Sequence, residues 1–127
     1  MLVDDRKDDR TLAHDILRSA GYNVYTAKNA SECMDLHKTH GDTVSVSIID
    51  VFMPGADGKA LLKSILMLDP SASIIMTSGF SRDYVRNYIE HGTWRFLQKP
   101  WVPDHLLTMV RSVIDKKNIS RKKSAIQ

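Results

Sequence analysis

The sequence has little cysteine, proline or glycine, and these shortages narrow the class of protein. Its single cysteine, Cys33, has no partner for an internal disulfide, which fits a reducing compartment. The four prolines and six glycines are scattered, and the chain has no low-complexity segment or internal repeat. No apolar run is long enough to span a bilayer, and no secretory signal peptide is evident. We therefore expect a cytoplasmic domain that does not bind membranes.

The rest of the composition is that of an ordinary globular domain. Hydrophobic residues make up 43% of the chain and charged residues 26%, so a hydrophobic core of useful size can form. A length of 127 residues suits one domain. The formal net charge of +3 is modest.

Basic charge is concentrated at the C-terminal end. Five of the 18 Lys and Arg residues fall in the last dozen positions: Lys116, Lys117, Arg121, Lys122 and Lys123. The other 13 face 15 Asp and Glu residues, so the body of the chain is slightly acidic. Such a tail could bind nucleic acid or anionic lipid, but a solvated helix end that leads into a linker is the more common structure. We expect a domain over residues 1–117 and a basic tail or linker over 118–127.

Short apolar strands alternate five times with amphipathic helices. The strand patterns fall at residues 1–3, 23–27, 44–49, 73–77 and 94–97. Helical periodicity, caps and glycine or proline stops predict helices at residues 9–20, 30–40, 58–68, 81–91 and 103–114. Asn29 or Ser31 is expected to cap the second helix. The expected inward faces are Leu12, Ile16, Leu17 and Ala20 in the first helix and Leu61, Leu62, Ile65 and Leu68 in the third.

This alternation predicts an α/β fold, namely a doubly wound, five-stranded parallel sheet with helices on both faces. Right-handed crossovers leave few topologies for such a sheet. Binding sites in these folds form at the carboxyl ends of the strands, near the point where the strand order reverses. The residues at the strand ends are therefore the first candidates for a site.

Charged and hydroxyl side chains stand at four of the predicted strand ends. Asp4 and Asp5 follow the first strand and Asp50 the third, while Thr77 ends the fourth and Lys99 follows the fifth. Three close carboxylates repel one another, so either their pKa values rise or a cation binds between them. Magnesium suits a site with two or three protein carboxylates, because it keeps several waters. A metal ion, an ammonium and a hydroxyl together suit a phosphoryl group, which a carboxylate can accept as nucleophile.

Each of these residues alone has an ordinary structural explanation. An Asp pair after a strand often caps a helix, and Asp50 alone could cap the turn at Pro54 and Gly55. Thr is common in strands, and Lys before Pro is usually a surface residue. The functional interpretation depends on all of them falling at the strand ends of one sheet.

Four segments resemble the receiver domain of two-component response regulators. They read LVDD at 2–5, IIDVFMPGADG at 48–58, IIMTSG at 74–79 and FLQKPW at 96–101. Their order and spacing are typical of that family, with Lys99 twenty-two residues after Thr77 and Gly58 eight residues after Asp50. The resemblance covers residues 1–117. It implies a flavodoxin-like, CheY-like (βα)5 fold and a role in a histidine–aspartate phosphorelay.

Carried over position by position, the resemblance implies roles for the strand-end residues. Asp50 would accept a phosphoryl group from a histidine kinase or a phosphotransfer protein. Asp5 and Asp50 would bind Mg²⁺ directly. Asp4 would assist, directly or through water, and the backbone carbonyl of Phe52 would be a further ligand. Lys99 would pair first with Asp50 and then with the phosphoryl oxygens.

The resemblance also implies a conformational switch. Thr77 would move to hydrogen-bond the phosphoryl group, and Phe96 would turn inward as Thr77 moves. Ser78 is a rival for the hydroxyl role because some family members read SGY at this place, although the spacing to Lys99 favours Thr77. An output domain, a partner or a second copy would bind the surface formed by residues 81–91, 94–97 and 103–114.

Three other interpretations remain open from the sequence. A degenerate receiver would act only as a docking module, although the intact set of acids, hydroxyl and lysine argues against it. A metal-dependent phosphatase or phosphotransferase normally has a second acid two residues after its nucleophile, where this chain has Phe52. A nucleic-acid binder would use the basic tail, but no helix-turn-helix or zinc motif follows Lys117. We expect a phosphoacceptor switch that is not a true enzyme and does not bind nucleic acid directly.

Overall fold

The computed structural model of the chain describes residues 1–89 and 94–126, apart from the side chains of residues 56, 121 and 123–126. The strands in these residues are β1 (Leu2–Val3), β2 (Thr26–Ala27), β3 (Ser47–Asp50), β4 (Phe52–Met53), β5 (Ala56–Asp57), β6 (Ile74–Ser78) and β7 (Arg95–Gln98). The helices are α1 (Lys7–Ser19), α2 (Ala30–His40), the 3₁₀ helix η1 (Gly41–Thr43), α3 (Gly58–Leu68), α4 (Arg82–Tyr88) and α5 (Pro103–Ile126).

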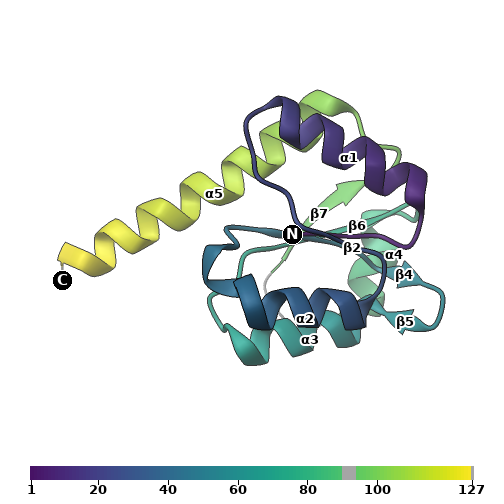
Figure 1. Ribbon diagram of the computed structural model, residues 1–127, viewed down its shortest axis with the longest axis horizontal. Helices are drawn as coiled ribbons and strands as arrows, with labels where there is room; N and C mark the ends of the chain where they lie inside the picture. The colour runs from purple at the N-terminus through teal and green to yellow at the C-terminus, as the bar shows by residue number, and fades with distance from the viewer. Residues whose placement is uncertain (90–93, 127) are drawn as a thin grey trace.

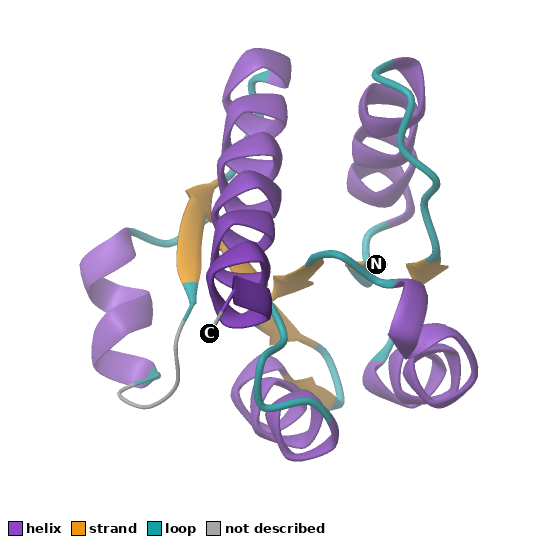
Figure 2. Ribbon diagram, turned by 90° about the vertical axis from the view of Figure 1, so that its left-hand side faces the viewer, coloured by secondary structure: helices purple, strands orange, loops and turns teal. Residues whose placement is uncertain are grey.

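Five of the strands form one parallel sheet in the order β2-β1-β3-β6-β7. This is the doubly wound, flavodoxin-like order, and it confirms the predicted fold class. The helices α1 and α5 lie on one face of the sheet, and α2 and α3 lie on the other (Figures 1 and 2). The winding reverses at β1, which has β2 on one side and β3 on the other.

Strand residues alternate between two hydrophobic clusters, because successive side chains point to opposite faces of a sheet. On the side of α1 and α5, the buried strand residues are Leu2, Ile48, Ile75 and Leu97. On the side of α2, α3 and α4, they include Val3, Ile49, Met76 and Phe96. A residue at a strand end can therefore be assigned to a face by counting in twos from these positions.

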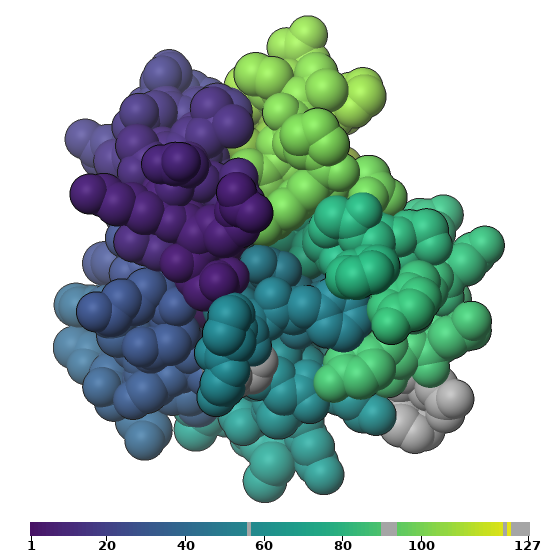
Figure 3. All heavy atoms as spheres, turned by 90° about the vertical axis from the view of Figure 1, so that its right-hand side faces the viewer, coloured from purple at the N-terminus to yellow at the C-terminus, as the bar shows by residue number. Residues whose placement is uncertain are grey.

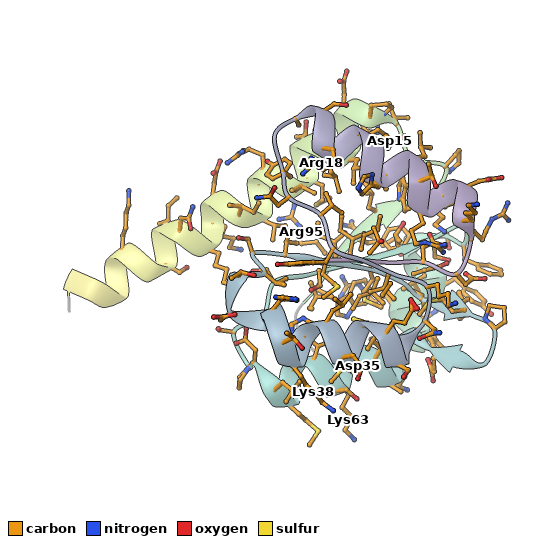
Figure 4. The ribbon with its side chains drawn as sticks, in the orientation of Figure 1. Asp15, Arg18, Asp35, Lys38, Lys63 and Arg95 are labelled. Carbon is orange, nitrogen blue, oxygen red and sulfur yellow. The ribbon has the colours of Figure 1, made fainter. Side chains whose placement is uncertain are left out.

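The outer surfaces of the helices are charged. Asp15 on α1, Asp35 and Lys38 on α2 and Lys63 on α3 are exposed and lie on the outer sides of these helices (Figure 4). Across the part of the chain that the structure describes, no helix is both long enough and apolar enough to cross a membrane.

Two helices begin and end where the sequence predicts, and side-chain caps explain their starts. Asn29 caps α2 by accepting a hydrogen bond from the backbone N–H of Glu32, which settles the choice between Asn29 and Ser31. Asp57 caps α3 by accepting from the N–H of Lys59. These caps confirm the predicted helices at 30–40 and 58–68.

Gly58 lets α3 begin directly against the end of β3. A Cβ atom at this position would lie 2.6 Å from the carbonyl oxygen of Val51 and 2.9 Å from that of Asp50. The Gly58 N–H instead donates to the Val51 carbonyl at 3.0 Å. Only glycine fits this approach, because the atoms that a side chain would meet belong to the backbone.

A small hairpin that the sequence did not predict lies between β3 and α3. Strands β4 and β5 pair antiparallel through Phe52 with Asp57 and Met53 with Ala56. The turn between them contains Pro54, followed by Gly55 with a φ of +67°. A proline followed by a glycine at positive φ is typical of a type II turn, which reverses the chain beside the strand end.

Some predicted boundaries and faces were wrong. The helix α1 begins at Lys7, two residues before the prediction, and Leu12 and Ala20 are exposed while Ala13 is buried. Leu68, predicted to face inward, is 53% exposed at the end of α3. The helix predicted at 81–91 ends at Tyr88, and its last two predicted positions lie outside the described residues.

The last helix is much longer than predicted. It runs from Pro103 to Ile126, whereas the sequence predicted an end at Ile114. Its second half leaves the body of the domain as a single rod (Figure 1). The segment 118–127, expected to be a tail or linker, is therefore a continuation of α5 up to Ile126.

Candidate functional site

The predicted site residues meet at the carboxyl edge of the sheet, where the winding reverses between β1 and β3. Asp4 and Asp5 follow β1, Asp50 is the last residue of β3, and Lys99 directly follows β7. Figure 3 views the molecule from this side. The N-terminal segment, the middle of the chain and the green segments on the C-terminal side all contribute to this surface.

Three carboxylates form an acidic cluster, which consists of Asp4, Asp5 and Asp50. One oxygen from each lies within 4.8 Å of the others. Asp4 is fully buried, Asp50 is 5% exposed and Asp5 is partly exposed. The Asp4 carboxylate accepts a hydrogen bond from the backbone N–H of Arg6 at 2.9 Å, while its carbonyl accepts from Arg10 at 2.8 Å. These bonds hold the loop that begins after β1.

The ammonium of Lys99 joins this cluster to a fourth carboxylate. Its Nζ lies 2.7 Å from Asp4 Oδ2, 3.0 Å from Asp9 Oδ2 and 3.2 Å from Asp50 Oδ2. The resemblance predicted the pairing with Asp50 and placed Asp4 in the same site, but it gave no role to Asp9, which lies in the first turn of α1. An acid in that turn is expected from the helix dipole alone, so nothing in its local sequence pointed to the site.

Burial and charge set the protonation of the site. Burial raises the pKa of Asp50 to about 6; the Lys99 charge opposes this rise and the Asp4 charge adds to it. For Lys99, burial alone would lower the pKa, but the hydrogen bonds to Asp4 and Asp9 and the negative charges of Asp50 and Asp4 together outweigh that effect, so the pKa is raised. Lys99 is therefore a fixed cation, and its charge compensates only part of the effect of burial on the Asp50 carboxylate.

The acidic cluster has the donors that Mg²⁺ prefers. Magnesium takes oxygen ligands, usually a few protein carboxylates together with waters. The cluster offers three carboxylates, and the partial exposure of Asp5 leaves access to solvent. A divalent ion would also offset the repulsion that contributes to the raised pKa of Asp50. The residues present therefore fit a magnesium ion.

Thr77 faces away from the predicted switch residue. It lies two positions after Ile75, on the side of α1 and α5. Its buried hydroxyl donates to the Leu97 carbonyl at 2.7 Å and accepts from Trp101 Nε1 at 2.9 Å. Phe96 lies on the opposite face. A relay in which Phe96 enters space left by Thr77 is thus wrong in this structure, because the sheet separates the two side chains.

Ser78 lies on the same face as Phe96. It follows Met76 by two positions and is 2% exposed. Its Oγ accepts a hydrogen bond from the backbone N–H of Phe80 at 3.0 Å, which leaves the hydroxyl hydrogen for another acceptor. The Ser78 carbonyl accepts from the backbone N–H of Lys99 at 2.9 Å, so these residues are neighbours across the ends of β6 and β7.

Aromatic rings pack beside the acidic cluster, around the hairpin. The ring centroid of Phe52 lies 5.2 Å from that of Phe80, 5.9 Å from that of Tyr84 and 5.2 Å from that of Tyr88. We call these four residues the aromatic cluster. The Tyr88 hydroxyl donates to the Asp57 carboxylate at 2.9 Å. The aromatic cluster thereby joins the β4–β5 hairpin to α4 and to the loop before it.

Comparison with known proteins gives a consistent result. A family model described as "Response regulator receiver domain" matches residues 1–111. The chemotaxis protein CheY of Bacillus subtilis is 31% identical over 118 residues, which cover 91% of this chain and 96% of that protein. The solved structure of NtrX from Brucella abortus in complex with ATP has a TM-score of 0.91 at 26% identity, covering 99% of this chain and 29% of that chain.

Several relatives are much longer than this chain. The C4-dicarboxylate transport transcriptional regulatory protein DctD of Rhizobium meliloti is 32% identical over 119 residues, which are 93% of this chain but 25% of that protein. The chain spans 13% of the sensor kinase CckA of Brucella abortus, to which it is 30% identical. The same domain thus occurs within proteins of different architecture.

Proposed function

The chain belongs to the response regulator receiver domain family, and on that basis we propose that it is a phosphoacceptor switch of a histidine–aspartate phosphorelay. Asp50 accepts a phosphoryl group from a histidine kinase or a phosphotransfer protein. The main support for this proposal is that the acidic cluster and Lys99 lie together at the edge of the sheet where the winding reverses. A receiver that acted only as a docking module would have no need for this buried set of charges.

The proposed chemistry is an in-line displacement at phosphorus. An oxygen of the Asp50 carboxylate forms the new O–P bond as the N–P bond of the phosphohistidine breaks, and the departing imidazole takes up a proton from water. A carboxyl with a pKa of about 6 is mostly ionised at neutral pH, so Asp50 is available as a nucleophile. Lys99 then holds the phosphoryl oxygens through charge-assisted hydrogen bonds.

We assign the Mg²⁺ ligands within the same site. Asp5 and Asp50 would bind the ion directly, Asp4 directly or through water, and the backbone carbonyl of Phe52 would be a further ligand. When bound, the ion neutralises the carboxylates and the phosphoryl oxygens. The all-oxygen donor set and the closeness of the three carboxylates support this assignment.

We propose Ser78 and Phe96 as the switch pair, in place of Thr77 and Phe96. Both lie on the same face of the sheet, and Ser78 has a hydroxyl hydrogen that its bond to Phe80 does not use. Movement of Ser78 toward the phosphoryl group would change the space beside Phe96. The change would reach the surface formed by α4, β7 and the first half of α5, where an output domain, a partner or a second copy would bind.

Chemical phosphorylation tests the proposal. Acetyl phosphate with Mg²⁺ should add one phosphoryl group, detected by intact mass, and hydroxylamine should remove it because an acyl phosphate is labile. Asp50→Asn should block the addition. Asp35→Asn, on the exposed side of α2, should behave like the wild type (Figure 4). Label that resists hydroxylamine or persists in Asp50→Asn would contradict the proposal. No uptake by the folded protein would favour the docking-only receiver.

A further inference from the structure

We propose that Asp9 is a positioning residue that holds the Lys99 ammonium in the unphosphorylated state and thereby weakens the binding of a phosphoryl group at Asp50. The inference rests on the proposed function, because it concerns the lysine that would hold the phosphoryl oxygens. The motifs in the sequence assign no role to Asp9. Its part in the site is visible only from the contact between α1 and the residue that follows β7.

The donors of Lys99 are fully used in this structure. An ammonium has three N–H donors, and here it contacts three carboxylates, from Asp4, Asp9 and Asp50. The distance to Asp50, 3.2 Å, is the longest of the three. The ammonium therefore lies closer to Asp4 and Asp9 than to the phosphoacceptor. A phosphoryl group that takes more than one bond from Lys99 must release another acceptor.

Asp9 is the acceptor that can be released most easily. Its side chain is 29% exposed, whereas that of Asp4 is fully buried, so water can replace Lys99 at Asp9 but not at Asp4. Arg6 Nε lies 3.5 Å from the same Asp9 oxygen and would remain as a counter-charge. The position of Asp9 in the first turn of α1 also stabilises its negative charge.

Two effects of Asp9 oppose the phosphoryl group, and they can be separated. Asp9 competes for the Lys99 ammonium, and its own negative charge repels an anion that arrives nearby. The competition requires Lys99, whereas the repulsion does not. A variant that lacks Asp9 should therefore bind the phosphoryl group more tightly, and most of this gain should depend on Lys99.

The test is a titration with beryllofluoride, a mimic of the phosphoryl group, at saturating Mg²⁺. Asp9→Asn should bind it about three- to tenfold more tightly than the wild type, as expected for one partly exposed charged hydrogen bond. The matched control is Asp8→Asn, which removes an exposed charge from the same turn of α1. It should leave the affinity within about twofold of the wild type.

The same substitution in a protein that lacks Lys99 shows whether the gain in affinity depends on this lysine. In Lys99→Met the gain from Asp9→Asn should lose most of its size; a gain of undiminished size would mean that Asp9 acts only as a nearby charge and would overturn the inference. Without metal or mimic, NMR signals of the Lys99 ammonium should shift in Asp9→Asn and not in Asp8→Asn. Equal affinities of wild type and Asp9→Asn overturn the inference alone. A wild type that binds no beryllofluoride overturns the proposed function as well.

Discussion

The indole Nε1 of Trp101 donates a hydrogen bond to the hydroxyl of Thr77 at 2.9 Å, and both side chains are buried. The same hydroxyl donates to the carbonyl of Leu97. Trp101 in turn lies beneath Lys99, whose Nζ is 5.2 Å from the centre of the indole ring. Thr77 thus fixes the aromatic platform under the site's lysine.

This bond predicts a structural role for Thr77 and a different one for Ser78. Thr77→Val keeps the volume but leaves the Trp101 N–H and the Leu97 carbonyl without this partner, so the free energy of unfolding should fall by about 1–3 kcal/mol. Urea unfolding followed by tryptophan fluorescence measures this loss. Amide NMR with beryllofluoride should still report changes at Phe96 in Thr77→Val.

The matched variant is Ser78→Ala, on the opposite face of the same strand. It should retain the Trp101 environment but lose the response of Phe96 to beryllofluoride. If Thr77→Val abolished that response while Ser78→Ala preserved it, the assignment of the switch pair to Ser78 and Phe96 would be wrong.

The raised pKa of Asp50 predicts a pH-dependent cost in stability when metal is absent. Its folded-state pKa is about 6, above the ordinary 3.8, so the folded protein binds this proton more tightly than the unfolded chain does. Ionisation between about pH 4 and pH 6 therefore destabilises the fold. In EDTA at pH 7.5, Asp50→Asn should be more stable than the wild type by on the order of 3 kcal/mol.

The pH dependence of the stability difference between Asp50→Asn and the wild type tests this explanation. The advantage of Asp50→Asn should shrink as the pH falls through 6 and vanish near pH 4, where the carboxyl is neutral in both states. Thermal unfolding of both proteins across this range measures it. An advantage that stayed constant with pH would show that ionisation of Asp50 is not its source.

Gly58→Ala should disturb both stability and the site. The new Cβ would lie under 3 Å from backbone atoms of Val51 and Asp50, so either α3 or the end of β3 must move. Overpacking of this kind typically costs about 1–3 kcal/mol. Gly79→Ala is the control, because a Cβ there meets no atom within 4 Å. Equal melting temperatures for Gly58→Ala and wild type would contradict the close approach.

The contact between Tyr88 and Asp57 predicts a spectroscopic change. The hydrogen bond to the Asp57 carboxylate raises the pKa of the Tyr88 hydroxyl. Asp57→Asn should lower that pKa toward its ordinary value while still capping α3, since Asn is also a good N-cap. NMR of ¹³C-labelled tyrosine across the titration distinguishes Tyr88 from the other tyrosines. An unchanged Tyr88 titration would mean that the two side chains are not bonded in solution.

Metal binding should depend on Asp5, the partly exposed member of the acidic cluster. Mg²⁺ should change the fluorescence of Trp101, whose ring lies beside Lys99. Asp5→Asn should weaken this response by about tenfold or more, because a direct ligand loses its charge. Lys99→Ala should retain most of the metal response. A full response in Asp5→Asn would remove Asp5 from the ligand set.

The sequence predicted the elements with local signals and missed the features that depend on distant contacts. The cap expected at Asn29 or Ser31 and the apolar periodicity of residues 58–68 predicted α2 and α3 with the correct bounds. The end of α5 was predicted twelve residues too early, although no glycine or proline follows Pro103 to stop the helix. By contrast, Asp9 and Lys99 are 90 residues apart in the sequence, and no periodic pattern predicts their contact.

The assignment of Thr77 failed for a related reason. Its distance from Lys99 along the chain matched the family pattern, but the face of a strand residue depends on register. In the structure Met76 pairs with Phe96 and Thr77 with Leu97, so Thr77 and Phe96 point to opposite sides. This register depends on packing on both faces of the sheet, so the sequences of β6 and β7 alone do not determine it.

The length of α5 has a mechanical consequence. Thirteen residues follow Val113 to the end of the helix at Ile126, and at 1.5 Å per residue they form a lever about 20 Å long, whose far end leaves the body of the domain (Figure 1). A tilt of about 10° at the root of this lever, where Val110 and Val113 pack against the sheet, moves its tip by about 3 Å. A rearrangement too small to alter the core would therefore be amplified into a displacement as large as an atomic diameter at the far end of the helix.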